Sequence, residues 1–225
     1  MSAPWAELAP AVWLTLRLAA SAVAILLALC LPLAWWLATT RSRWRAPVEA
    51  LTTLPVVLPA TVLGFYLLVA FAPTAPLGGA FLRVTGTTLT FSFWGLLLAS
   101  VVHSLPFVIG PLRAAFAAVG PELREAAATL GARPWDVFRS VALPLSSRGV
   151  LTAAVLGFAH SLGEFGVILM VGGNIPGETR TVAIEIYNAV ETLDYRTAHV
   201  LSAGLLGLTF ASLLAVEIWG RRTWR

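Results

Sequence analysis

The 225-residue chain contains no lysine, although fifteen of its residues are basic: all fifteen are arginine. A Walker A loop needs a lysine, because that side chain holds the terminal phosphates of a bound nucleotide. Such a loop therefore does not exist in this sequence. If the protein works at the expense of ATP, hydrolysis takes place on another polypeptide.

Cysteine, histidine and charge are also scarce. The single cysteine, Cys30, lies in an apolar stretch without an intramolecular partner for a disulfide, so we interpret it as a small buried apolar residue. The three histidines, His103, His160 and His199, lie far apart, and no His-Glu-x-x-His motif is present. His160 and Glu164 have the i, i+4 spacing of two metal ligands, but without a third ligand we expect a hydrogen-bonded pair. The sequence predicts no metal site and no catalytic residue.

Apolar sequence, by contrast, is abundant. Hydrophobic residues make up 58% of the chain and charged residues 12%, and the mean hydropathy is +0.84. Soluble domains of this length do not have such a composition, and a helix needs about 20 apolar residues to cross a bilayer. Five runs reach that length: residues 11–38, 51–72, 91–112, 149–171 and 198–219. We expect an all-α, polytopic membrane protein with one transmembrane domain over residues 1–225.

Arginine is distributed unevenly between the two sides that five spans define. Three segments on one side hold eleven arginines: Arg41, Arg43, Arg45, Arg113, Arg124, Arg133, Arg139, Arg148, Arg221, Arg222 and Arg225. The other side holds only Arg83, Arg180 and Arg196, and Arg17 falls within the first run. Cytoplasmic loops carry the excess of positive charge, so we expect segment 113–148 and the C-terminus in the cytoplasm, with segment 172–197 and the N-terminus outside. A basic surface spread over three segments does not favour a nucleic-acid partner.

The predicted cytoplasmic segment has the pattern of a helix, a turn and a second helix. Pro121 suits the first turn of a helix, and Glu125 places negative charge toward the positive end of its dipole. Gly131 can end that helix, because glycine adopts the left-handed conformation needed there. Pro134 then begins a short helix with an apolar side, and Pro144 is expected to end it.

The spacing within this segment resembles the loop by which permease subunits of binding-protein-dependent ABC importers dock onto a separate ATPase. The matching order is Glu-Ala-Ala, three residues, Gly, nine residues, an aliphatic residue, one residue and Leu-Pro. By that resemblance the ATPase-docking residues are Glu125, Ala126, Ala127, Gly131, Ala132, Val141, Leu143 and Pro144. A pair of amphipathic helices lying on the membrane surface is the alternative, but it does not require this order of residues.

Two apolar runs contain features that are unusual in a membrane span. A carboxylate at Glu164 is costly there and normally faces a water-filled cavity or a partner. The flanking small residues Ser161, Gly163 and Gly166 permit close helix approach or a local break. Prolines at Pro55 and Pro59 predict a bend in the second run. These six residues either line the translocation path and its gate or only fix the packing and bending of the helices.

The loop after the fourth run makes the resemblance more specific. It reads Gly173-Asn174-Ile175-Pro176-Gly177-Glu178-Thr179-Arg180-Thr181. Together with residues 54–64 and 161–166, this loop resembles the corresponding segments of the permease of bacterial molybdate ABC importers. The resemblance extends over nearly the whole chain. The binding-protein contacts implied by the resemblance are Asn174, Pro176, Gly177 and Arg180. Apart from the resemblance, residues 179–191 have the spacing of an amphipathic helix.

The resemblance implies an oxyanion importer of the bacterial inner membrane, specific for molybdate and possibly tungstate. Such a chain forms a homodimer, docks two cytoplasmic ATPase subunits and receives its anion from an external binding protein. It is not itself an enzyme and carries no cofactor, because ATP and magnesium belong to the partner ATPase. A sulfate or thiosulfate permease shares part of the pattern. Two further hypotheses are an ion-driven secondary transporter that uses His160 and Glu164 and, more remotely, a metal-dependent intramembrane hydrolase.

Overall fold

Three uninterrupted helices dominate the computed structural model, which describes the backbone of residues 4–222 and the side chains of residues 8–218. They are α1 (Pro4–Thr39), α5 (Phe93–Ala118) and α12 (Tyr195–Arg222). Within the described part of the chain, these three are long and apolar enough to cross a membrane alone. Arg225, one of the arginines assigned to the cytoplasmic side, lies outside the described residues.

The second apolar run is broken where its prolines predict a bend. Helices α2 (Arg45–Val57) and α3 (Ala60–Phe71) meet at an angle of 111°. Pro59 caps the start of α3, and the Leu58 N–H still donates to the carbonyl of Leu54. Because proline has no N–H and clashes with the preceding turn, the helix restarts in a new direction after Pro59.

The fourth run is also divided, at its carboxylate. Helix α9 (Ser147–Gly163) ends one residue before Glu164, and the short helix α10 (Gly166–Gly172) begins two residues after it. The segment that precedes α9, Pro134–Leu145, meets it at 74°. The described residues thus provide three membrane spans, or up to five if each of the two bent helix pairs forms one span.

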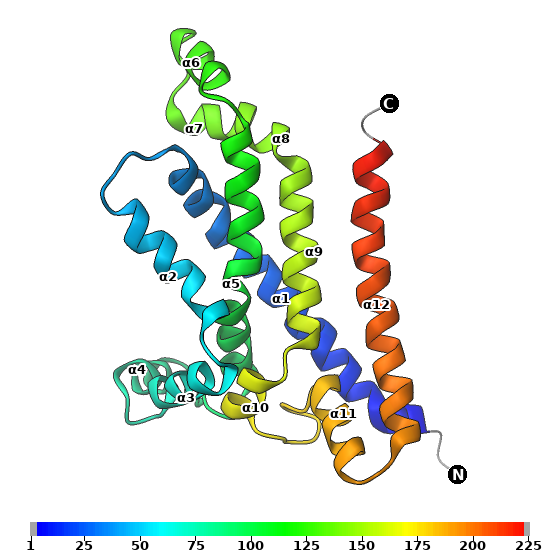
Figure 1. Ribbon diagram of the computed structural model, residues 1–225. Coiled ribbons are helices and arrows are strands. Elements are labelled where there is room, and N and C mark those ends of the chain that lie inside the picture. Colours follow the sequence, from blue (N-terminus) through cyan, green and yellow to red (C-terminus); the bar gives the residue numbers. More distant parts are fainter. Residues whose placement is uncertain (1–3, 223–225) are drawn as a thin grey trace.

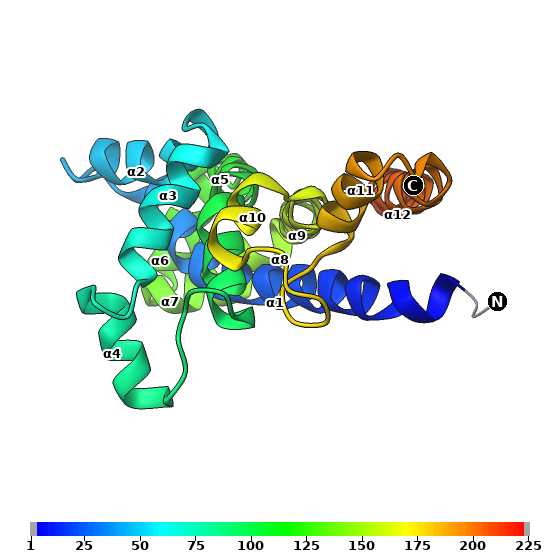
Figure 2. The same ribbon diagram turned by 90° about the horizontal axis from the view of Figure 1, so that it is seen from below.

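The core lies where α1, α5 and α9 pack together, with α2, α3 and α10 on one side and α12 on the other (Figures 1 and 2). Its fully buried side chains include Leu18, Leu26, Leu96, Val108, Leu112 and Phe116. Phe116 lies beyond the predicted span 91–112. Burial of this ring explains why α5 continues six residues into the segment that was expected to be a loop.

Shorter helices lie at the two ends of the bundle. The end that carries α6 (Pro121–Thr129) and α7 (Pro134–Val137) also receives the C-terminal end of α12 (Figure 1). The opposite end in Figure 1 carries α4 (Pro76–Thr85), α11 (Val182–Glu191) and the start of α1. Helix α4 was not predicted, whereas α11 covers most of the expected amphipathic helix 179–191.

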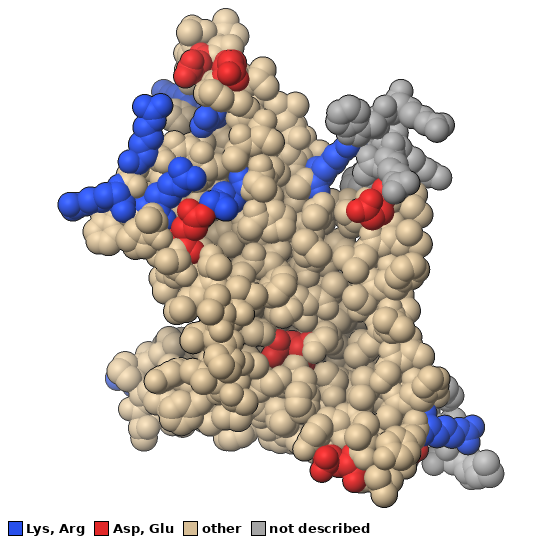
Figure 3. Space-filling model, viewed as in Figure 1, with Lys and Arg blue, Asp and Glu red and all other residues tan. Residues whose placement is uncertain are grey.

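Charge is segregated in the same way. On the face drawn in Figure 3, arginines gather at the end that carries α6 and α7, and the band between the two ends is almost uncharged apart from one acidic patch at its centre. An apolar band between two charged ends is the surface expected of a chain that crosses a bilayer.

Candidate functional site

The first half of the predicted docking loop has the conformation that its sequence indicated. Helix α6 contains Glu125, Ala126 and Ala127, and Gly131 follows with a φ of +85°. The N–H of Ala132 donates to the carbonyl of Ala127 (3.1 Å), and that of Gly131 donates to the carbonyl of Ala128 (2.9 Å). This pair of bonds is a Schellman ending, which requires a left-handed residue at the glycine.

The second short helix ends at Leu145, one residue after Pro144, so the end expected from the sequence is confirmed to within one residue. After α7, the chain forms a π-helical turn over Phe138–Ala142 and continues as α8 (Leu143–Leu145). In the π turn, the N–H of Leu143 donates to the carbonyl of Phe138, five residues earlier. Pro144 then occupies the first turn of α8, where its missing N–H is tolerated. The helical path changes direction directly after Leu145.

Aromatic side chains anchor this loop to the bundle. Phe138 is buried with its ring centroid 5.7 Å from that of Trp35 in α1 and 5.8 Å from that of Phe116 in α5. Ser146, between α8 and α9, donates through Oγ to the carbonyl of Ala115 (3.3 Å). The loop is therefore attached to α1, α5 and α9 at once.

The opposite side of the loop exposes large apolar side chains. Their exposed fractions are 51% for Leu123, 89% for Leu130, 62% for Trp135 and 60% for Leu145. The apolar face expected for the second helix is thus divided, since Phe138 points inward and Trp135 outward. Large apolar groups projecting from a polar loop at a charged end of the molecule form a surface suited to a protein partner.

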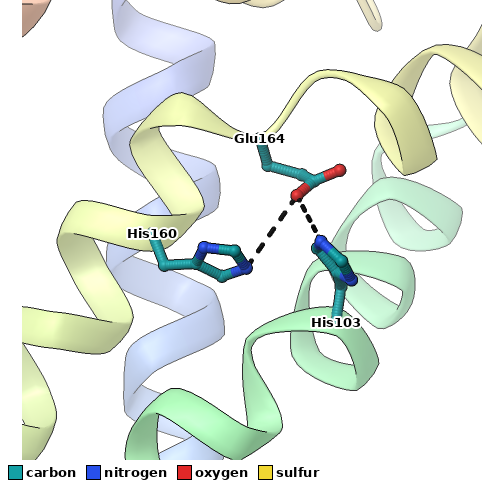
Figure 4. A group of neighbouring side chains, drawn as sticks. All are labelled: His103, His160 and Glu164. Carbon is teal, nitrogen blue, oxygen red and sulfur yellow. Dashed lines mark ion pairs between the residues drawn. The ribbon is translucent and has the colours of Figure 1, made fainter. Parts of the chain in front are cut away.

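A cluster of ionisable side chains lies at the break in the fourth run. His103 of α5 approaches Glu164 with a distance of 2.9 Å between Nε2 and Oε2, and His160 Nε2 lies 4.0 Å from the same oxygen (Figure 4). The other carboxylate oxygen, Oε1, accepts a hydrogen bond from the N–H of Val167 at the start of α10 (3.0 Å). The conclusion that the histidines lie far apart is therefore wrong for two of the three, because the fold brings α5 against α9.

Ser161 also connects α9 to α5. Its Oγ lies 3.3 Å from Ser100 Oγ and 3.0 Å from Ser104 Oγ, and all three side chains are buried. His103, Ser100 and Ser104 were not predicted as members of this region. An ionisable residue within an apolar run is a signal on its own, so His103 could have been identified. The two serines gave no comparable signal.

The two broken runs pack against each other through α3 and α10. A Cβ at Gly166 would lie 2.8 Å from the Cβ of Ala60, and a Cβ at Gly64 would lie 2.7 Å from that of Met170. Pro59, at the start of α3, belongs to this contact region, whereas Pro55 is buried within α2 and Gly163 has open space at its Cβ position. The structure thus brings Ser161, Glu164, Gly166 and Pro59 into neighbouring elements.

Three of the four predicted binding-protein contacts line a depression with both polar and apolar walls at the other end of the bundle: Pro176, Gly177 and Arg180. Asn174, Pro176 and Gly177 are exposed, and Arg180 donates to the Asn174 side chain (Nε to Oδ1, 2.6 Å) and pairs with Glu185 (3.3 Å). Pro176, Gly177, Arg180 and Glu185 line a cavity of about 660 Å³.

The start of α12 lies beside this depression and is capped by a carboxylate. Asp194 Oδ1 accepts a hydrogen bond from the N–H of Thr197 (3.2 Å). Hydrogen bonds from the Thr197 side chain and backbone lower the pKa of Asp194 below its usual value. An ionised Asp194 therefore favours the start of α12 in its observed conformation.

Comparison with known proteins gives consistent results for sequence and fold. Residues 30–223 match the family of binding-protein-dependent transport system inner membrane components. The chain is 51% identical to the molybdenum transport system permease protein ModB of Azotobacter vinelandii over 92% of this chain and 91% of that protein. It is 38% identical to ModB of Escherichia coli K12 over 81% and 80% of the two chains. A solved chain of the MetNI methionine ABC transporter, captured in an inward-facing conformation, superposes with a TM-score of 0.77 at 20% identity and 100% coverage of both chains.

Proposed function

Since this chain belongs to the family of binding-protein-dependent transport system inner membrane components, we propose that it is the permease subunit of an ATP-driven importer for molybdate. The relatives that are similar over most of the chain are molybdenum permeases, and we infer the transported anion from this similarity. It is a transport component and not an enzyme. ATP and magnesium bind to the partner ATPase, and tungstate, which resembles molybdate in shape and charge, is a second substrate.

The observation that carries the coupling to an ATPase is the geometry of the loop 121–145. It projects from the arginine-rich end of the bundle (Figures 1 and 3), exposes Leu130 and Trp135, and holds Gly131 in a left-handed conformation. We assign Glu125, Ala126, Ala127, Gly131, Ala132, Val141, Leu143 and Pro144 to ATPase docking. A groove on a cytoplasmic ATPase would cover the exposed apolar side chains and so remove their contact with water.

The attachment of this loop to the bundle provides a route by which movement of the ATPase reaches the membrane helices. Phe138 and Ser146 connect it to α1, α5 and α9, so closure of two ATPase subunits would move these helices together. The far end of α9 is the break at Glu164, where α10 packs on α3. The breaks near Pro59 and Glu164, with Ser161, Gly163, Gly166 and Pro55, are the proposed gate. Alternation between inward-facing and outward-facing states would open it to one side at a time.

The two ends of the bundle take different partners in this proposal. The arginine-rich end and the C-terminus face the cytoplasm of a bacterial inner membrane, and the N-terminus faces outward. An external binding protein contacts Asn174, Pro176, Gly177 and Arg180 at the depression beside the start of α12. A second copy of the permease completes the channel. Helix α12 supports such a dimer, because only 6% of its most apolar stretch is buried within one chain.

The test is ATP hydrolysis by the permease reconstituted in liposomes with its ATPase and its binding protein. Molybdate, tungstate, sulfate and no anion are compared at equal concentration. Stimulation by molybdate and tungstate, but not by sulfate, is the expected result. Stimulation by sulfate alone would refute the assignment of the anion, and failure of the ATPase to assemble with the permease would refute the assignment of the loop.

A further inference from the structure

We propose that His103, His160 and Glu164 form a binding site for a divalent transition metal ion of the zinc class. The three residues come from α5, from the last turn of α9 and from the break that follows it, and their side chains converge on one point (Figure 4). One ligand atom from each residue lies within 4.8 Å of the other two. Metal binding here does not depend on the proposed transport function.

The distances between the donor atoms fit a zinc ion. With metal–ligand bonds of about 2.1 Å in tetrahedral geometry, neighbouring ligand atoms lie about 3.4 Å apart. The two distances from Glu164 Oε2, 2.9 Å to His103 Nε2 and 4.0 Å to His160 Nε2, lie on either side of that value. All three donor atoms lie within 4.8 Å of one another, so side-chain rotations that move them by about an ångström would bring them to this common spacing.

The chemical character of the donors selects the class of metal. Two imidazoles and one carboxylate suit zinc, cobalt, nickel or ferrous iron. A single carboxylate is too few hard ligands for calcium or magnesium, and the absence of a thiolate or thioether from the three ligands disfavours cuprous copper. Three protein ligands leave at least one coordination position for water or for another oxygen ligand.

Two of the ligands are held in place before any metal arrives. The His160 ring stacks on Phe107, with 3.9 Å between centroids and an interplanar angle of 22°. Glu164 is fixed through Oε1 by the N–H of Val167. The His160 Nε2 atom is buried without a hydrogen-bond partner among the described residues, although it points toward the carboxylate. A metal ion would supply the missing partner, and a buried polar atom without one is costly.

Charge also favours a cation at this position. Glu164 is buried in a run that is otherwise apolar, and an uncompensated carboxylate there is expensive. A dipositive ion bound by this carboxylate would compensate its charge within the apolar run. It also links α5 to the end of α9, so it would hold the break at Glu164 in its present arrangement.

The test is a titration of the nucleotide-free permease–ATPase complex with Co²⁺ after removal of bound metals by a chelator. Cobalt in a four-coordinate site gives intense visible absorption bands, and one ion per permease chain is expected. His103→Ala and His160→Ala should each weaken the binding at least tenfold, and the double variant should abolish the bands. His199→Ala is the matched control, because His199 is exposed on α12, and it should bind cobalt as the unaltered protein does.

A second measurement uses the unaltered chain, so the result does not depend on how well the variants fold. X-ray absorption at the zinc edge of the loaded complex should show imidazole nitrogens and a carboxylate oxygen at about 2.0–2.1 Å from the metal. The site would be refuted if no cobalt bound at micromolar concentration, if binding survived in the double variant, or if the zinc spectrum showed no imidazole nitrogen bound to the metal.

Discussion

Replacing Gly131 by alanine should weaken ATPase docking without disturbing the membrane helices. The φ of Gly131 is +85°, and no described atom lies within 4 Å of the position that a Cβ would take. Alanine therefore meets no steric clash, and its only cost is the left-handed backbone, at about 1–2 kcal/mol. A change of that size corresponds to a factor of about 5–30 in an equilibrium constant.

The assay is the affinity of the purified ATPase for the permease in lipid nanodiscs, combined with thermal unfolding of the permease alone. Gly131→Ala should lower the affinity by about 5–30-fold, because the free loop relaxes from the left-handed turn and has to adopt it again on docking. The unfolding temperature of the membrane helices should stay unchanged. Gly131→Asn should lose less, since asparagine tolerates the left-handed conformation better than alanine does.

Gly110→Ala provides the matched control. Gly110 also has open space at its Cβ position, but it lies inside α5 with an ordinary helical φ. Alanine should be neutral or stabilising there, by about 0.5–1 kcal/mol. If Gly131→Ala docked as tightly as the unaltered protein, or if alanine and asparagine at that position lost equal affinity, the left-handed turn would not be what presents the loop to its partner.

Four further outcomes follow from the same structure. Trp135→Ala should weaken ATPase binding, measured in the same assay, while the permease alone unfolds at an unchanged temperature. Phe138→Ala should destabilise the permease itself by about 3–5 kcal/mol, seen as a lower unfolding temperature in detergent; no change would contradict its anchoring role. Gly166→Ala should reduce molybdate uptake, and adding Ala60→Gly should restore it, because the clash lies between the two Cβ atoms. Because folding lowers the pKa of Asp194, its carboxylate stabilises the start of α12 above pH 3.8, and this stabilisation is lost as the pH falls through the pKa of the folded state. In Asp194→Asn, the unfolding temperature should therefore depend less on pH in that range.

Features that depend on local sequence were predictable. The long apolar runs, the bend at Pro59 and the left-handed Gly131 all follow from the chemistry of a few neighbouring residues. The break at Glu164 was foreseen as one effect of its flanking glycines. In the structure, this break allows the carboxylate to accept the N–H of Val167, which an unbroken helix would have used internally.

Features that depend on tertiary contacts were not predictable. His103 and Glu164 are sixty-one residues apart, and only the packing of α5 against α9 brings them within 2.9 Å of each other. The π turn that buries Phe138 and Ala142 is a second such feature, because no local motif in the sequence indicates it. Helix α4 is short, and Pro76, Gly78 and Gly79 in its first turn are residues typical of a loop.

Uptake of radioactive molybdate into liposomes tests the central claim most directly. The liposomes contain the permease and its ATPase, the binding protein is added outside, and ATP is enclosed inside or omitted. Uptake that requires enclosed ATP, is abolished by Gly131→Pro in the docking loop, and continues when a protonophore removes the proton gradient is the predicted result. Uptake that proceeds without the ATPase and collapses with the proton gradient would contradict the account, because the chain would then be an ion-driven transporter.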